Sequence, residues 1–184
     1  MPLFFDTSAL GKLYVEEPGS ERMDELVSRP GSLGGFFISD CVAVEVYGLF
    51  AKRLRIAEEE RRKQKGGKAV ERENRARYQT ASLEFRHDYE GGRFSRVDIG
   101  REILQSAARF AQAFPGRRVS PMDLIHLATV FYLTEQLQEA GSNHNVVLAV
   151  CDQPLLMLAD RHGVPTWNPE ADDLSDLRAP GLFP

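Results

Sequence analysis

The sequence has few of the residues that cross-link small proteins or hold structural metals. Its 184 residues include only two cysteines, Cys41 and Cys151, which lie far apart and lack the spacing of a zinc site. The histidines also lack zinc-ligand spacing; they are His87, His126, His144 and His162. These shortages exclude a disulfide framework and a structural zinc centre, and we expect both thiols to be reduced and packed.

Long hydrophobic runs are missing as well. No apolar stretch approaches the roughly 18 to 20 residues that a membrane span needs. The N-terminus has no basic region followed by a long apolar run, so we see no signal peptide. With 42% hydrophobic and 27% charged residues, the composition is typical of a globular protein. We therefore expect no membrane association and a location in the cytoplasm.

Several motifs of well-known enzymes are absent. The chain has no glycine-rich phosphate loop of the G-x-x-x-x-G-K-[ST] or G-x-G-x-x-G type. It also has no G-x-S-x-G nucleophile elbow. These absences argue against a P-loop nucleotide site, a dinucleotide site and serine-hydrolase chemistry.

Charge is distributed unevenly along the chain. The formal net charge is -4, but residues 52–77, here called the basic segment, contain 11 Lys/Arg and 5 Glu. The basic segment therefore carries +6 and the rest of the chain -10. An acidic body with a basic segment would place cation-binding carboxylates beside a surface that binds polyanions. The alternative is a pair of charged, solvated helices without a binding role.

Short strands alternate with amphipathic helices in the apolar pattern. Strands are expected at 2–5, 36–38, 146–150 and 164–167. Helices are expected from a cap at Thr7 or Ser8, from Ser20, from about residue 40 into the basic segment, and over 68–87, 97–114, 121–138 and 153–162. This alternation predicts an α/β fold with a parallel sheet.

Two aspartates follow predicted strands. Asp6 comes directly after the strand at 2–5, and Asp152 follows the strand at 146–150. In parallel sheets, sites lie beyond the carboxyl ends of the strands, so we expect these two acids on the same edge. For each residue a local alternative remains open, because an aspartate in this position also caps the following helix.

Two further acids lie on predicted helices. Glu45 interrupts an apolar helix stripe, and Asp123 comes three residues after Ser120 in a pattern close to a capping box. An exposed helix face for Glu45 and a helix cap for Asp123 are the alternatives. Four acids gathered at one edge would repel one another, and Mg²⁺ or Mn²⁺ would relieve that repulsion through oxygen ligands. His126, one turn after Asp123, is interpreted as a packing or supporting residue.

Four motifs occur in a fixed order along most of residues 3–169. They are the start at Phe4 to Tyr14, Ile38-Ser39 through Val44-Glu45, Ser120 to Ala128 with its Asp-x-x-His-Leu-Ala pattern, and Val147 to Asp152 followed by 155–169. Together these motifs resemble the PIN-domain family, particularly the VapC-type toxins of toxin–antitoxin pairs.

The resemblance implies a three-layer α/β/α domain around a central parallel sheet. The PIN-like domain would cover residues 1–168, with a helical arm inserted at about 52–92, and residues 169–184 would form a C-terminal extension. The implied activity is that of a metal-dependent endoribonuclease, using Mg²⁺ or Mn²⁺. The metal-binding and catalytic acids would be Asp6, Glu45, Asp123 and Asp152, and Thr7 or Ser8 would support the first acid.

The resemblance also implies partners. RNA would be the substrate, a small antitoxin protein would silence the toxin, and the chain would form a homodimer. The basic segment offers cations for RNA backbone phosphates, namely Arg53, Arg55, Arg61, Arg62, Lys63 and Lys65.

The chain departs from the family pattern at Val150. Family members usually carry Ser or Thr two residues before the fourth acid, and here that position holds a valine. A PIN-like module that binds RNA or a partner without cutting is therefore the main alternative. A phosphatase with an aspartate nucleophile after the first strand is a second alternative, although Ser8 occupies the position where such enzymes usually have another aspartate.

Overall fold

The computed structural model describes residues 1–28, 35–63, 68–113 and 119–178. Within these ranges, five short strands form one parallel sheet in the order β3-β2-β1-β4-β5. The strands are β1 (Leu3–Phe5), β2 (Phe36–Ser39), β3 (Ser95–Val97), β4 (Val147–Ala149) and β5 (Thr166–Trp167). The predicted α/β class with a parallel sheet is confirmed.

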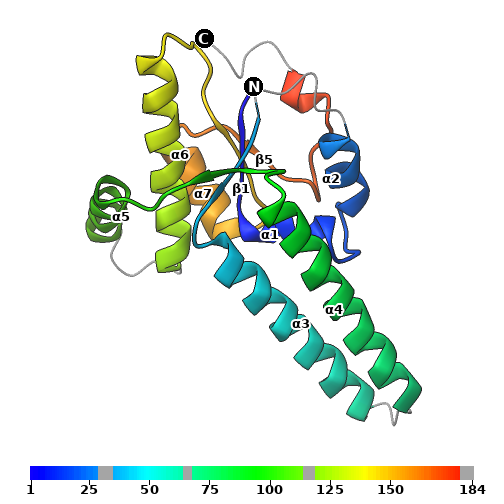
Figure 1. The fold of residues 1–184 in the computed structure, drawn as a ribbon. Helices are drawn as coiled ribbons and strands as arrows, with labels where there is room; N and C mark the ends of the chain where they lie inside the picture. The colour runs from blue at the N-terminus through cyan, green and yellow to red at the C-terminus, as the bar shows by residue number, and fades with distance from the viewer. Residues whose placement is uncertain (29–34, 64–67, 114–118, 179–184) are drawn as a thin grey trace.

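Helices cover both faces of the sheet, which gives the three predicted layers (Figure 1). Successive side chains of a strand point to opposite faces, and β1 shows this directly. Leu3 and Phe5 belong to one buried core, whereas Phe4 belongs to the other. Because β1 lies in the middle of the sheet, its end is a point that both helical layers approach.

The first layer contains the helices from the first half of the chain. These are α1 (Thr7–Leu10), the 3₁₀ turn η1 (Gly11–Leu13), α2 (Ser20–Val27), and the inner parts of α3 (Val42–Lys63) and α4 (Lys68–Glu90). The second layer contains α5 (Arg101–Ala113), α6 (Pro121–Glu139) and α7 (Gln153–Arg161). None of the described helices is long and apolar enough to cross a membrane.

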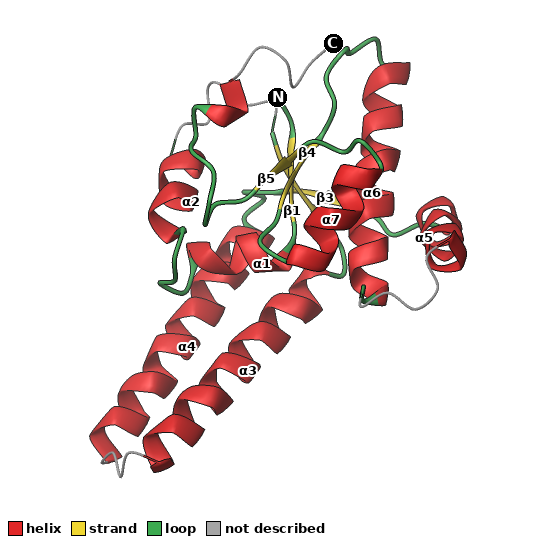
Figure 2. Ribbon diagram, turned by 180° about the vertical axis from the view of Figure 1, so that it is seen from behind, coloured by secondary structure: helices red, strands yellow, loops and turns green. Residues whose placement is uncertain are grey.

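Helices α3 and α4 form an antiparallel pair that projects away from the sheet (Figure 2). This α3–α4 hairpin contains the basic segment. Its inner end packs into the first core through residues such as Val46, Phe50 and Phe85. Residues 64–67, which include Gly66 and Gly67, lie outside the described residues.

One predicted helix is wrong at its start. Residues 95–97 form β3 rather than a helix, and α5 begins only at Arg101. The strand pairs with β2, with Phe37 opposite Ser95. Ser95 and Arg96 are both exposed, so the segment lacks the apolar alternation that reveals a strand in sequence. Phe114, at the predicted helix end, lies outside the described residues.

The segment after β5 packs against the body of the domain. Leu177, in the 3₁₀ turn η3 (Asp176–Arg178), is buried in the first core. The Trp167 Nε1–H donates to the Asp173 carbonyl at 3.2 Å, and Glu170 forms an ion pair of 2.6 Å with the buried Lys12. The division of the chain at residues 168 and 169 stays a prediction.

Candidate active site

Asp6 and Asp152 extend from neighbouring central strands. β1 pairs with β4 so that Phe5 lies opposite Ala149, and the Asp6 N–H donates to the Ala149 carbonyl at 3.0 Å. Asp6 is nearly buried, whereas Asp152 is partly exposed three residues beyond Ala149. The structure therefore places both aspartates at the carboxyl edge of the sheet, as their positions in the sequence predict.

Asp6 is also the N-cap of α1. Its side chain accepts a hydrogen bond from the Ser8 N–H at 2.9 Å, so the prediction that Thr7 or Ser8 caps this helix is wrong. An aspartate is a favourable cap because its oxygen accepts from the free N–H groups of the first turn. The Ser8 Oγ–H donates to the same Asp6 oxygen at 2.5 Å.

Ser8 joins Asp6 to the end of the neighbouring strand. Its Oγ atom donates to Asp6 and accepts a hydrogen bond from the Cys151 N–H at 2.9 Å. Cys151 directly precedes Asp152. A single hydroxyl therefore spans the two connections that carry the first and fourth acids.

Glu45 is held by residues from two other elements. It lies in the first turn of α3, and its Oε2 atom accepts a hydrogen bond from the Thr7 hydroxyl at 3.0 Å. The His126 Nε2–H, on α6, donates to the same oxygen at 2.6 Å. His126 Nε2 also lies 3.5 Å from Asp6 Oδ1. Asp6, Thr7, Glu45 and His126 thus meet at one point, where α1, α3 and α6 converge.

The buried His126 ring lies within reach of two carboxylates, those of Glu45 and Asp6. Burial by itself lowers the pKa of this imidazole, but the hydrogen bond with Glu45 and the charges of Asp6, Glu45 and Asp123 outweigh burial and raise the pKa. The sequence alone does not reveal this contact, because His126 reaches Glu45 only through the fold. The burial of His126 and its bond to Glu45 agree with a packing or supporting residue, and its role in a site stays a prediction.

Asp123 has both a local and a longer-range role. It forms a reciprocal capping box with Ser120: each side chain accepts from the other's backbone N–H, at 2.7 and 3.1 Å. Burial raises the pKa of the Asp123 carboxyl, hydrogen bonds from Ser120 lower it, and the charges of Asp6 and Asp152 raise it. Two of the causes that raise the Asp123 pKa are thus the charges of aspartates from other segments of the chain.

Asp152 is the N-cap of α7. Its Oδ1 atom accepts a hydrogen bond from the Leu155 N–H at 3.0 Å, and Pro154 follows in the first turn of the helix. Each of the three aspartates therefore uses one carboxylate oxygen for a helix cap. Within the described residues, Asp123 accepts through Oδ2 and Asp152 accepts through Oδ1.

Within the ranges that the structure describes, no group of three or more His, Cys, Asp and Glu side chains forms a ready-made metal centre. The donor chemistry nevertheless suits a hard divalent cation, because the acids offer oxygens only. Mg²⁺ usually keeps several waters and is held by one or two carboxylates rather than by a closed protein cage. Besides burial, the negative charges of Asp6 and Asp152 raise the pKa of Asp123, and a bound cation would reduce this repulsion. Carboxylate oxygens are therefore the kind of donor that Mg²⁺ or Mn²⁺ prefers, and the sharing of one ion by the four acids stays a prediction.

The two thiols are free and half-buried. Burial raises the pKa of the Cys151 thiol to about 12, and burial also raises the pKa of Cys41. Both groups are therefore neutral near pH 7, and neither has the thiolate character of a nucleophile or a metal ligand.

Much of the positive charge of the α3–α4 hairpin is matched by glutamates. The ion pairs are Arg53 with Glu17 at 2.8 Å, Arg55 with Glu59 at 3.9 Å, and Arg61 with Glu71 at 3.3 Å. Arg62 and Lys63 are exposed and make no ion pair with another described residue. Lys65 lies outside the described residues. The assignment of these side chains to RNA stays a prediction.

A solved structure shares this architecture. The structure of Mycobacterium tuberculosis VapC20, a Sarcin-Ricin loop cleaving toxin, matches with a TM-score of 0.55 over 85% of this chain and 94% of that chain. The two sequences are 13% identical, so the likeness concerns the fold. No protein-family model and no curated protein matches the chain. The chain thus has a PIN-like α/β fold, and the resemblance seen in the sequence is confirmed at the level of the fold.

Proposed function

We propose that the chain is a divalent-metal-dependent endoribonuclease and the toxin of a type II toxin–antitoxin pair. The observation that carries this proposal is the joint placement of Asp6 and Glu45 around His126 at the carboxyl edge of the sheet. The electrostatic coupling of Asp123 to Asp6 and Asp152 supports the same site. The fold shared with a toxin that cleaves an RNA loop supports the reaction class.

The proposed chemistry is hydrolysis of an RNA phosphodiester. Water attacks the phosphorus in line, and the bond to the 3′ oxygen breaks, which leaves a 5′-phosphate and a 3′-hydroxyl. Asp6, Glu45, Asp123 and Asp152 would hold Mg²⁺ or Mn²⁺, which when bound lowers the pKa of water and stabilises charge on phosphate oxygens.

The chain's own residues fix the acids before substrate arrives. Thr7 and His126 hold one Glu45 oxygen, which leaves Oε1 without a hydrogen bond from any other described residue. Ser8 holds Asp6. Such pre-organisation matters because a displacement of about 1 Å in a catalytic group is enough to lower a rate severely.

RNA is proposed as the substrate because of the shared fold. Single-stranded or looped RNA would fit the open carboxyl edge of the sheet better than a duplex would. Arg62 and Lys63 are the described basic residues of the hairpin best placed to meet phosphates, because they are exposed and lack ion pairs with described residues. We further propose a cytoplasmic location, an antitoxin that covers the four acids, and a homodimer.

The test is cleavage of a single-stranded RNA and of an RNA hairpin in Mn²⁺ or Mg²⁺, with and without EDTA. The wild type should cut in the presence of metal, and Asp6→Asn should lose at least a hundredfold in rate. Asp160→Asn is the matched control, because Asp160 is exposed on α7 and lies away from the edge. Equal rates for wild type and Asp6→Asn would remove the proposed site.

The second candidate function is a PIN-like module that binds RNA or a partner without cutting. Val150 favours it, because this residue is fully buried in the second core and offers no hydroxyl two residues before Asp152. RNA binding by the wild type without metal-dependent cleavage would select this module over the nuclease.

A further inference from the structure

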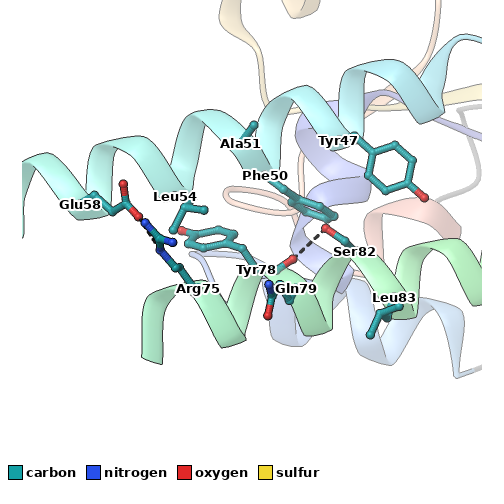
Figure 3. A pocket seen from close by; sticks show the side chains of 10 residues that line it. All are labelled: Tyr47, Phe50, Ala51, Leu54, Glu58, Arg75, Tyr78, Gln79, Ser82 and Leu83. Carbon is teal, nitrogen blue, oxygen red and sulfur yellow. Dashed lines mark hydrogen bonds and ion pairs between the residues drawn. The ribbon is translucent and has the colours of Figure 1, made fainter. Parts of the chain in front are cut away.

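Several ion pairs of this chain lie at its surface. One of them, between Glu58 and Arg75 at 3.1 Å, crosses the groove of about 790 Å³ between α3 and α4 (Figure 3). The Arg75 side chain is 56% exposed, and exposed pairs of this kind contribute little to stability. The ion pair between Lys12 and Glu170 is different, because the Lys12 side chain is only 2% exposed.

Lys12 is a buried cation that ends between two glutamates. It lies in η1, and its Nζ atom is 2.6 Å from Oε1 of Glu170 and 3.7 Å from Oε2 of Glu17. Lysine is rarely buried, because removal of its charge from water is costly unless the charge is paired. Glu17 is shared with Arg53, at 2.8 Å, so Glu170 is the main partner of Lys12.

The connection from β4 to α7, residues 150–152, is held on one side by the segment that follows β1. The Cys151 N–H donates to the Ser8 Oγ atom at 2.9 Å. Four residues after Ser8, the same segment reaches Lys12. The residue that binds this connection and the buried cation therefore belong to one short stretch of chain.

On its other side the same connection is held by β5. β4 lies between β1 and β5 in the sheet, and the Val150 N–H donates to the Trp167 carbonyl at 3.0 Å. Three residues after Trp167 the chain reaches Glu170. The Lys12–Glu170 pair thus joins the two segments that flank residues 150–152, and the contacts form a closed ring around this connection.

The backbone that carries Glu170 is itself fixed. The Pro169 carbonyl accepts a hydrogen bond from Nη1 of Arg22 at 2.8 Å, and the Glu170 N–H donates to the Asn168 side chain at 2.9 Å. Gly19 has a φ of 90° and lies so close to Pro169 that a Cβ atom on Gly19 would be 2.6 Å from the carbonyl oxygen. These contacts hold Glu170 at one place beside the domain.

Stability alone does not account for the buried pair. The cost of removing charges from water offsets much of their attraction, and replacement of a buried ion pair by apolar residues is often neutral or stabilising. Glu170 is 43% exposed, so its carboxylate keeps part of its hydration. What the pair does supply is a fixed distance between two segments that both begin at the carboxyl edge of the sheet.

We propose that Lys12 is a positioning residue for Asp152, with Glu170 as its partner. The pair holds the segments after β1 and β5 together, so that residues 150–152 between them keep the Asp152 carboxylate in place. Lys12 acts through Asp152 rather than on the substrate, because its ammonium group is buried against two glutamates. This role rests on the proposed metal-dependent reaction, in which Asp152 is one of the four acids.

Amide hydrogen exchange of the metal-free full chain tests the positioning without any assay of activity. The amides of Cys151 and Leu155 report on the two ends of the connection, because one donates to Ser8 and the other to Asp152. Exchange at both amides should be at least tenfold faster in Lys12→Met, which removes the charge and keeps an apolar side chain of similar length. Exchange in β1 should stay as in the wild type.

A second variant guards against a fault of the first. Glu170→Ala should accelerate the same two amides, and the double variant Lys12→Met/Glu170→Ala should add little, because both substitutions remove one contact. The urea midpoint of Lys12→Met should lie within about 0.5 M of the wild type, since an apolar residue replaces a buried charge.

Asp173→Asn is the matched control. Asp173 belongs to the same C-terminal segment and forms an ion pair with Arg22 at 3.8 Å, but its side chain is 77% exposed. The control should leave the exchange of the Cys151 and Leu155 amides within twofold of the wild type.

Kinetics and metal binding provide a readout that general stability does not change. In Lys12→Met, kcat for RNA cleavage should fall at least fivefold while KM stays within twofold. The affinity for Mn²⁺ should fall about threefold. Asp173→Asn should change none of these quantities.

Three outcomes overturn the proposal. The first is wild-type exchange at Cys151 and Leu155 in both single variants. The second is faster exchange throughout the sheet with a lower urea midpoint, which would show a role in general stability alone. The third is faster local exchange with wild-type cleavage. A wild type that neither binds Mn²⁺ nor cleaves RNA would instead overturn the proposed function, and hydrogen exchange would still decide whether the pair fixes residues 150–152.

Discussion

The Nε2 atom of His126 lies 2.6 Å from Oε2 of Glu45, although 81 residues separate them in the sequence. This hydrogen bond joins α6 to the first turn of α3. Because the same nitrogen lies 3.5 Å from Asp6 Oδ1, the imidazole fixes two carboxylates at once. In this account His126 is a positioning residue that sets the distance between the acids.

Replacement of His126 should therefore reduce both stability and cleavage. His126→Ala removes a buried ring and leaves Glu45 without its shorter hydrogen bond, so we expect a loss of about 2 to 4 kcal/mol in the free energy of unfolding. Urea denaturation measures this loss. His126→Gln retains a donor and should stay folded while losing at least tenfold in RNA cleavage. The control is His144→Ala, at an exposed loop position. Wild-type cleavage by His126→Gln would show that the contact does not position Glu45.

Two substitutions separate the capping role of Asp152 from its proposed metal-binding role. Asparagine still accepts the Leu155 N–H bond, so Asp152→Asn should change the unfolding free energy by less than about 0.5 kcal/mol and still abolish most of the cleavage. Asp152→Ala loses the cap as well and should cost about 1 kcal/mol more. Thermal unfolding and a cleavage assay on both variants provide the comparison. If Asp152→Asn cleaves normally while Asp152→Ala does not, capping alone explains the residue.

Ser8 should act on cleavage through Asp152. Its hydroxyl accepts the Cys151 N–H bond, so Ser8→Ala should loosen the connection that carries Asp152 and lower the cleavage rate about tenfold. In a double-mutant cycle, Ser8→Ala should add little to the loss already caused by Asp152→Asn. Ser82→Ala, which removes a hydroxyl from α4, is the control. Fully additive losses would show that Ser8 acts on Asp6 alone or only on stability.

Tyr14 should make the fold sensitive to alkaline pH. Burial, followed by the charge of Asp88 and the hydrogen bond to it, raises the pKa of this phenol far above its ordinary value of 10.0. In the unfolded chain the phenol ionises near pH 10, while in the folded chain it stays protonated. The contribution of Tyr14 to the free energy of unfolding is therefore complete below pH 10. Above pH 10 the free energy of unfolding should fall, by up to about 1.4 kcal/mol per pH unit.

Denaturation of wild type and Tyr14→Phe between pH 8 and 11 measures this dependence. Phenylalanine cannot ionise, so the variant should lose stability less steeply above pH 10, although it lacks the 2.9 Å bond to Asp88. Parallel pH profiles for the two proteins would contradict the assignment.

The sheet and the two acids at its edge could be predicted for two reasons. The strands are short apolar runs that are visible in the sequence, and the carboxyl ends of parallel strands lie at the same edge of a sheet. Phe4 and Phe5 before Asp6, and Val147 to Val150 before Asp152, are apolar runs that end in an acid. Parallel strands then bring the two acids to one edge. The strand β3 could not be predicted in this way, because its Ser95 and Arg96 are exposed and only pairing with β2 makes them a strand.

The contacts that organise the candidate site were beyond sequence reasoning for a different reason. The bond between His126 and Glu45, and the bridge from Ser8 to Cys151, join segments whose relative placement only the packed fold decides. The same holds for the hairpin, where Arg53 and Glu17 neutralise each other across 36 positions. Local spacing gives no signal for such pairs.

Binding of Mn²⁺ to the purified chain, followed by electron paramagnetic resonance, tests most directly whether the four acids share a cation. The account predicts one or two bound ions per chain, with affinity lowered at least tenfold by Asp6→Asn and by Asp123→Asn but unchanged by Asp160→Asn. A chain that binds no Mn²⁺ at millimolar concentration, or binds it equally well in all these variants, would contradict the account.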